Sequence, residues 1–260
     1  MKIVTLIENT TCREDLRCEH GLSLYIEANG RRLLFDSGAS GAFADNACKL
    51  GIDLSAVDAA VLSHGHNDHS GGFLRFLACN TTASVYLRPE ATERYYSSSG
   101  EYIGLDPLLG ISNRLCFTED VQIIGEGMTL YACNTLEKTV AVDSAGLTLC
   151  RDGKYIPDQF LHEQYLLVEE AGKRVLISGC SHKGILNIAR WFQPDVLIGG
   201  FHYMRVDPAD PMLHCAARTL LKYPTVYYTG HCTGLTQYAY LKAIMGDQLH
   251  YIAAGTIVEL

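Results

Sequence analysis

Short apolar runs alternate with polar, glycine-containing segments along the whole chain, a pattern that predicts strands and helices mixed throughout. Two pairs of apolar runs, 22–28 with 31–36 and 165–170 with 173–178, are each joined by a dipeptide ending in glycine, which is typical of β-hairpins. Further strands are predicted at 2–8, 59–62, 84–87, 121–124, 128–132, 195–198, 225–228, and near residues 250 and 257. Helices are predicted at 42–50, 73–78, 184–192, 211–222 and 235–245.

Two regions break this pattern. Residues 90–113 include a polar and aromatic run at 95–102, which fits either a surface excursion or a lid that contacts substrate. Residues from about 133 to 160 show no regular periodicity, and we expect them to be irregular.

The two predicted hairpins belong to a weak internal repeat. Residues 25–36 resemble residues 167–178, with Gly30 matching Gly172. Each hairpin is followed by a predicted helix and then by an apolar strand that leads to a histidine. Two such halves predict two sheets packed face to face with helices outside, in one domain over residues 1–260.

Composition narrows the class of protein. With 48% hydrophobic and 19% charged residues, the 260-residue chain is typical of a globular protein. A net charge of −8 argues against non-specific binding of nucleic acid. We find neither a signal-peptide pattern nor an apolar run long enough to span a membrane, and therefore expect a cytoplasmic protein with mostly reduced cysteines. General frequencies favour a homodimer if the chain associates.

The strongest chemical signal follows the apolar run at 59–62. His64, His66, Asp68 and His69 lie within six residues, and imidazole and carboxylate are ligands that suit Zn2+, Mn2+ or Fe2+. His64 and His66 can point the same way because alternate side chains of an extended chain share a face, which leaves Asp68 and His69 for a second metal. A solvated histidine-rich loop is the alternative. Only 10 of 260 residues are histidine, so three histidines within six positions favour a metal site over a chance grouping.

This motif, with Asp36 closing an earlier strand, resembles the metallo-beta-lactamase fold superfamily. The resemblance implies an α+β fold, a four-layer αββα sandwich of two mixed sheets with helices outside, and mostly hydrolytic chemistry. Residues 20–23, 178–184, 199–202 and 230–234 resemble the branch named 7,8-dihydropterin-6-methyl-4-(beta-D-ribofuranosyl)aminobenzene 5'-phosphate synthase. That name implies a methanopterin-type phosphate ester.

The resemblance also implies a ligand set for one or two Zn2+ ions, with Mn2+ or Fe2+ as alternatives. His64 and His66 would hold the first metal, and Asp68, His69 and His231 the second. Asp36 would hold the histidine loop, since ligating imidazoles need an acceptor on their other nitrogen. His231 follows a predicted strand and fits this role from its context, with a histidine at the edge of the core as the alternative.

The chain departs from the family pattern at two points. A further histidine ligand is usual between the first motif and the second hairpin, where this chain offers only His162, which we predict not to be a ligand. The usual bridging aspartate corresponds to Cys180, and either Cys180 or His182 is expected to complete the site. Occupancy by two metals depends on which of them does so.

Other residues are candidates for contact with substrate. Asp68 would orient the attacking hydroxide or accept its proton, and His20 and His202 either stabilise negative charge on a reacting oxygen or are structural. Lys183 and Arg205 either bind a phosphate or are solvated surface charges.

We therefore predict a metal-dependent hydrolase that uses a metal-bound hydroxide on a small phosphorylated substrate, pterin-like or a phosphodiester. A thioester or lactam hydrolase of the same fold is one alternative, and a non-enzymatic, metal-dependent sensor of a small ligand is another. An open coordination position would distinguish catalysis from a closed structural site, and the mixed histidine and aspartate set favours catalysis.

Overall fold

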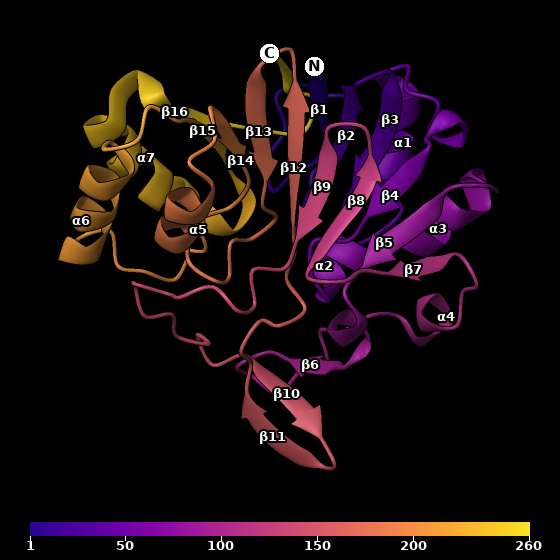
Figure 1. The fold of residues 1–260 in the computed structure, drawn as a ribbon, viewed down its shortest axis with the longest axis horizontal. Coiled ribbons are helices and arrows are strands. Elements are labelled where there is room, and N and C mark those ends of the chain that lie inside the picture. The colour runs from indigo at the N-terminus through magenta and orange to yellow at the C-terminus, as the bar shows by residue number, and fades with distance from the viewer.

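Two seven-stranded sheets form the centre of the computed structural model, which describes residues 1–260 (Figure 1). The first sheet has the order β17-β1-β2-β3-β4-β5-β7. Its strands are β1 Lys2–Ile7, β2 Ser23–Ala28, β3 Arg31–Phe35, β4 Ala59–Val61, β5 Ser84–Leu87, β7 Leu115–Phe117 and β17 Ile257–Glu259. The last strand pairs with the first, so the two ends of the chain lie side by side.

The second sheet has the order β16-β15-β14-β13-β12-β9-β8. Its strands are β8 Val121–Gly125, β9 Met128–Tyr131, β12 Tyr165–Glu170, β13 Lys173–Ile177, β14 Val196–Ile198, β15 Val226–Thr229 and β16 Leu249–Tyr251. Each sheet contains both parallel and antiparallel pairs, and both predicted hairpins, β2–β3 and β12–β13, are present.

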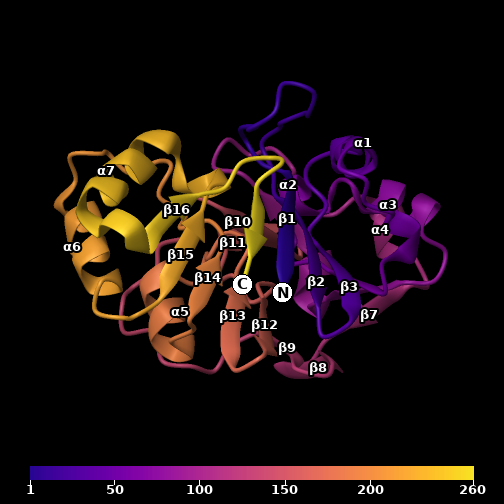
Figure 2. The same ribbon diagram turned by 90° about the horizontal axis from the view of Figure 1, so that it is seen from above.

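Helices cover the outer face of each sheet (Figure 2). α1 Ala42–Lys49, α3 Phe73–Cys79 and the short α4 Pro107–Gly110 lie on the side of the first sheet, and α5 Ile185–Phe192, α6 Pro211–Leu220 and α7 Leu235–Met245 on the side of the second. The remaining helix, α2 Asn67–Ser70, lies inside the histidine motif. The predicted αββα sandwich is therefore confirmed. None of the helices is both long and apolar enough to cross a lipid bilayer.

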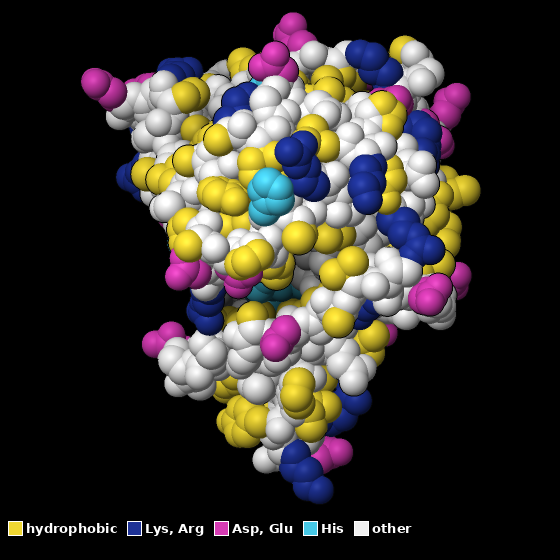
Figure 3. All heavy atoms as spheres, turned by 90° about the vertical axis from the view of Figure 1, so that its left-hand side faces the viewer, with side chains coloured by type: hydrophobic (Ala, Val, Ile, Leu, Met, Phe, Trp, Pro, Cys, Tyr) yellow, Lys and Arg dark blue, Asp and Glu magenta, His cyan; other side chains and the backbone are white.

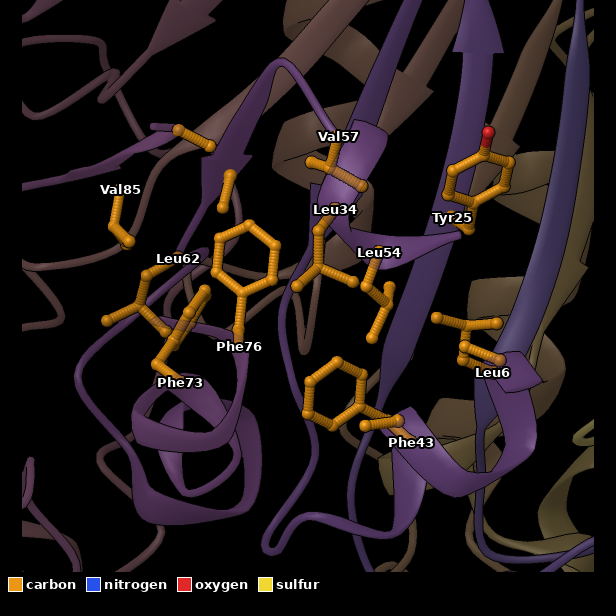
Figure 4. Packing of buried hydrophobic residues seen from close by; sticks show 14 of the residues in the cluster. Leu6, Tyr25, Leu34, Phe43, Leu54, Val57, Leu62, Phe73, Phe76 and Val85 are labelled. Carbon is orange, nitrogen blue, oxygen red and sulfur yellow. The ribbon is translucent and has the colours of Figure 1, made fainter. Parts of the chain in front are cut away.

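Alternation along the strands divides the buried apolar residues among three cores. Leu33 and Phe35 of β3 face the second sheet, whereas Leu34 between them packs under the helices of the first. In that helix-side core Phe43 and Phe73 pack against the sheet (Figure 4). A third core lies between the second sheet and α5 to α7. Burial of each large apolar side chain stabilises the fold by roughly 1.5–3 kcal/mol before the entropy of ordering is subtracted.

The internal repeat is visible in the topology. After hairpin β2–β3 the chain passes through α1 into β4, which lies parallel to β3. After hairpin β12–β13 it passes through α5 into β14, which lies parallel to β13. The carboxyl ends of neighbouring parallel strands meet at one edge of a sheet, and this arrangement brings the loops that follow β4 and β14 to the same edge of the sandwich.

One prediction about the elements was wrong. The region expected to be irregular contains a hairpin, β10 Thr148–Arg151 and β11 Lys154–Pro157, which pairs with β6 Arg94–Tyr96 from the other unusual region. This three-stranded sheet projects from the lower side of the sandwich in Figure 1. All four residues of β11 are exposed, so its sequence has no buried face and no apolar alternation to indicate a strand.

Candidate metal centre

The predicted ligands come together at one edge of the sandwich, in the loops that follow strands of both sheets. Asp68 is 19% exposed, whereas the other six side chains are buried. These six are His64, His66 and His69 from the first half, and Cys180, His182 and His231 from the second. Within the group, the contacts form two neighbouring clusters, which adjoin where His64, His69 and Cys180 lie within 4.8 Å of one another.

The first cluster contains three histidines. The ligand atoms of His64, His66 and His182 lie within 4.8 Å of one another, with 3.3 Å between Nε2 of His64 and Nε2 of His182. Nε2 of His66 and Nδ1 of His182 are buried and have no hydrogen-bond partner. Buried polar atoms are almost always paired, so the unpartnered Nε2 of His66 favours a bound group between the rings.

The second cluster contains mixed ligands. Nε2 of His69 lies 3.1 Å from Nε2 of His231 and 3.1 Å from Sγ of Cys180. Oδ2 of Asp68 lies 3.3 Å from Nε2 of His231 and 3.9 Å from Nε2 of His69. Sγ of Cys232, a residue that the sequence analysis did not single out, lies within 4.8 Å of Cys180 Sγ and of a His231 ring nitrogen.

Hydrogen bonds on the far side of the rings determine which nitrogens face the clusters. Nδ1 of His69 lies 2.7 Å from a carboxylate oxygen of Asp36, and Nδ1 of His231 lies 2.9 Å from Oδ1 of Asn9. Both oxygens only accept, so each Nδ1 carries a proton, and each Nε2 can offer its lone pair to a metal once any proton on it is displaced. Two lone pairs 3.1 Å apart repel unless a cation lies between them. Ligands at 2.0–2.1 Å from a tetrahedral zinc ion are about 3.4 Å apart, so the observed spacing fits a metal.

Asp36 holds the histidine loop from below. Besides His69, its carboxylate accepts hydrogen bonds from the backbone N–H of Ser63 at 2.7 Å and from the Ser63 hydroxyl at 2.6 Å. Ser63 Oγ lies in turn 2.8 Å from Nδ1 of His64. One buried carboxylate thereby orients a ring in each cluster, directly for His69 and through Ser63 for His64.

Burial and neighbouring charged groups shift the pKa values of the candidate ligands. Burial, with His69 beside it, lowers the pKa of His64, and burial with His202 beside it lowers the pKa of His182. Burial opposes ionisation of Asp68, but His69 and His231 hold its pKa well below the ordinary value. Burial likewise opposes charge on His231, yet hydrogen-bonded Asp68 raises its pKa to about 9.

Burial raises the pKa of the Cys180 thiol, so a cation is needed to hold it as a thiolate. Metal binding at these clusters would therefore displace protons from Cys180 and His231.

Cys180 and His182 were expected as alternatives, but the structure brings both to the site. Cys180 joins the mixed cluster, and His182 lies with His64 and His66. His182 supplies the third histidine of the first cluster, for which the span before the second hairpin offered only His162. The two residues separate because Ser181 between them has a left-handed φ of 60°, which turns the chain between the two side chains.

His162 and Lys183 are both buried inside the protein. Nδ1 of His162 accepts a hydrogen bond from the Gly65 N–H at 2.8 Å, and Nε2 lies 3.0 Å from Asp158, so both ring nitrogens have protein partners. Lys183 was expected either to bind phosphate or to be a surface charge, and both expectations were wrong. Its ammonium group is buried and donates to the backbone carbonyls of Ala132 and Glu163.

A cavity of about 710 Å³ opens beside the clusters, and histidine lies at its floor in Figure 3. Its wall includes residues next to β6 and β10, so the projecting sheet closes one side of it. His20 and His202 both line the cavity. Nε2 of His20 is 3.4 Å from Asp68 Oδ2, and the ring of His202 is centred 4.3 Å from that of His182. Burial, with a smaller effect of His66, lowers the pKa of His202 to about 4.

Sequence reasoning missed several residues that hold the site. Glu8 is buried and accepts a hydrogen bond from the N–H of His231 at 2.5 Å, and Asn9 orients the His231 ring. Both directly follow the first strand, more than 200 residues before His231 in sequence. A buried strand that ends in adjacent polar residues was the only available signal, and it is too common to be specific.

Known proteins resemble this chain in sequence and in structure. A family model described as the metallo-beta-lactamase superfamily matches residues 16–135. The crystal structure of Tm1679, a metal-dependent hydrolase of the beta-lactamase superfamily, is 30% identical, with a TM-score of 0.86 over 100% of this chain and 99% of the other.

Two relatives are from Methanocaldococcus jannaschii. An uncharacterized protein is 28% identical over 89% of this chain and 90% of its own. The 7,8-dihydropterin-6-methyl-4-(beta-D-ribofuranosyl)-aminobenzene-5'-phosphate synthase is a distant homologue, 24% identical over 100% of this chain and 96% of its own. The chain belongs to the metallo-beta-lactamase superfamily, a fold of metal-dependent hydrolases that usually bind divalent metals.

Proposed function

We propose that the protein is a hydrolase that binds two divalent metal ions, most simply Zn2+, and acts on a small phosphorylated substrate. The observation that carries the proposal is the pair of adjacent clusters, in which histidine Nε2 atoms face one another at 3.1 Å and 3.3 Å beside an open cavity. A structural zinc site is closed by protein ligands, whereas a catalytic site leaves room for water and substrate.

The two clusters suggest which residues would bind each metal and which would act on water and substrate. His64, His66 and His182 would hold one metal, and Asp68, His69, Cys180 and His231 the other. When bound, the metals would activate water and polarise the bond to be broken. Asp68 borders the cavity and would orient the attacking water or accept its proton, while His202 would face negative charge that develops on the substrate.

The cavity wall supports an anionic substrate with an apolar body. Ile103, Leu147 and Met204 supply apolar surface, and Arg205 is the only lysine or arginine among the lining residues. The Arg205 guanidinium donates to Ser98 Oγ at 3.0 Å and has no carboxylate within ion-pair distance. An arginine without an acidic partner is suited to a phosphate or carboxylate, which it can bind through two parallel hydrogen bonds.

The first test combines metal content with turnover of bis(p-nitrophenyl) phosphate, a generic phosphodiester. We expect two metals per wild-type chain, and loss of metal-dependent turnover in His66→Ala while the protein stays folded by circular dichroism. His214→Ala, which removes an exposed histidine on α6, is the matched control and should leave both properties unchanged. Normal turnover and metal content in His66→Ala would remove this residue from the site.

A synthase acting on a phosphate ester is the second candidate, because the relative with that name matches the whole chain. Both candidates require the same metal clusters and differ in the bond that is made or broken. A protein with two bound metals that leaves phosphodiesters and simple phosphate monoesters intact would favour the synthase-type reaction.

A further inference from the structure

The tripeptide His162-Glu163-Gln164 is completely buried although all three side chains are polar. It precedes β12 and carries none of the metal ligands proposed above. Burial of such groups is costly unless each of them is hydrogen-bonded, so their partners indicate why they are there.

Glu163 binds the backbone of the loop that carries His182. One carboxylate oxygen accepts the N–H of His182 at 2.6 Å, and the other accepts the N–H of Lys183 at 2.9 Å and the hydroxyl of Tyr165 at 2.6 Å. The ammonium of Lys183 donates to the Glu163 main-chain carbonyl at 2.8 Å. The peptide on which His182 stands is thus attached to Glu163 from both sides.

The neighbours of Glu163 bind the histidine loop of the first half. Nδ1 of His162 accepts the N–H of Gly65, which lies between two of the first cluster's histidines. Gln164 donates from its side chain to the carbonyl of Leu62 at 2.8 Å and from its backbone to the carbonyl of Ser63 at 2.8 Å. The tripeptide therefore links the two loops whose histidines form the three-histidine cluster, loops more than 100 residues apart in sequence.

We propose that Glu163 is a positioning residue that fixes His182 within the three-histidine cluster, with His162 and Gln164 fixing the opposite loop to the same segment. The inference rests on the proposed function only in that it needs a metal at this cluster. Glu163 touches neither metal nor substrate, and it acts by holding the peptide from which the His182 ring reaches His64 and His66.

The test is Glu163→Gln followed by titration of the chelator-treated protein with Co2+. The Glu163 carboxylate accepts three hydrogen bonds and donates none. The NH2 group of a glutamine at this position must therefore face at least one of the three donors and leave it unpaired. We expect the mixed cluster still to bind one equivalent of Co2+ and to show the charge-transfer band between the Cys180 sulfur and cobalt. The other equivalent should bind roughly 10-fold to 100-fold more weakly, as when a group supporting a metal ligand is lost.

Asn80→Asp provides the matched control. Asn80 is also buried and holds backbone groups, donating to the carbonyls of Leu54 and Val57 and accepting the N–H of Ala83, but it lies at the end of α3 away from the clusters. Both substitutions exchange an amide for a carboxylate, or the reverse, without changing the shape of the side chain. Asn80→Asp should lower the free energy of unfolding and leave both cobalt affinities as in the wild type.

Two results would overturn the inference. One is a Glu163→Gln variant that binds both cobalt equivalents like the wild type, and the other is an equal loss of cobalt affinity in Asn80→Asp. If Glu163→Gln does not fold, Tyr165→Phe removes one donor from the same carboxylate and should weaken the same equivalent by a few-fold, so no change there also contradicts it. A wild-type protein that takes up no cobalt would overturn the proposed function and this inference together.

Discussion

Individual residues at the site adopt backbone conformations that residues other than glycine rarely adopt. Asp36, Ser181, His202 and His231 have φ between 50° and 60°, and each follows a strand that leads to the clusters. The left-handed region costs a residue with a side chain of order 1 kcal/mol or more, so it persists only where other contacts hold it. Here the hydrogen bonds of Asp36 and of Glu8 to the His231 backbone supply such contacts.

A prediction at the residue scale concerns Cys180. In Cys180→Ser the hydroxyl replaces a thiolate, and because a hydroxyl stays protonated near pH 7 we expect the mixed cluster to lose roughly tenfold or more in zinc affinity. Cys79→Ser changes a half-buried cysteine at the end of α3 and should bind metal like the wild type. Competition with a chromogenic chelator measures both affinities. Equal stoichiometry and affinity in the two variants would exclude Cys180 as a ligand.

The contact between neighbouring elements depends on a glycine at the start of α3. A Cβ on Gly72 would lie 2.2 Å from the carbonyl oxygen of Ser37 and 2.5 Å from that of Ser40, in the loop that follows β3. Both are backbone atoms, and Ser37 is buried, so they cannot move aside cheaply. The close approach brings His69, in the preceding helix α2, against the loop that begins with Asp36, where the His69 carbonyl accepts the N–H of Ser37 at 2.8 Å.

At the scale of elements we therefore expect Gly72→Ala to lower the free energy of unfolding by ~1–3 kcal/mol through overpacking. Gly110→Ala in α4 is the matched control, since a Cβ there meets nothing within 4 Å, and it should remain within about 0.5 kcal/mol of the wild type. Urea denaturation followed by circular dichroism measures both. Equal midpoints for the two variants would show that the α3 contact is more tolerant than the structure indicates.

On the scale of the whole molecule, the proposed metals join the two halves of the sandwich. Each cluster draws ligands from both halves, as in the pairs His64 with His182 and His69 with His231. A metal that binds only the folded chain stabilises it by RT ln(1 + [M]/Kd), or about 4 kcal/mol at a thousand times Kd. In a protein of this size that corresponds to a rise of roughly 10 °C in Tm.

Removal of metal should accordingly lower Tm. We expect EDTA treatment to reduce the melting temperature of the purified protein by roughly 10 °C, and an excess of Zn2+ over the chelator to restore it. Differential scanning calorimetry measures the change. Identical melting curves with and without EDTA, on protein shown to contain metal beforehand, would contradict a metal shared between the halves.

Features that depend on neighbouring residues could be predicted from the sequence alone. Apolar periodicity predicted the hairpins β2–β3 and β12–β13 and the longer helices, and the spacing from His64 to His69 indicated a metal-binding loop and the superfamily. These signals are local because side chains alternate along a strand and repeat along a helix. The hairpin β10–β11 escaped because β11 is fully exposed and β10 buries only Leu149, so the hairpin carries no such alternation.

Which distant residues meet depends on the tertiary structure. It separated Cys180 from His182 into two clusters, buried Lys183, and brought Glu163 to the backbone of the His182 loop. Cys180 lies 111 positions from His69, the residue that it contacts. Such contacts depend on how two sheets pack and how loops leave their strands, and no period in the sequence encodes either. The chemistry of this site was therefore readable from a few adjacent residues, whereas its geometry required the fold.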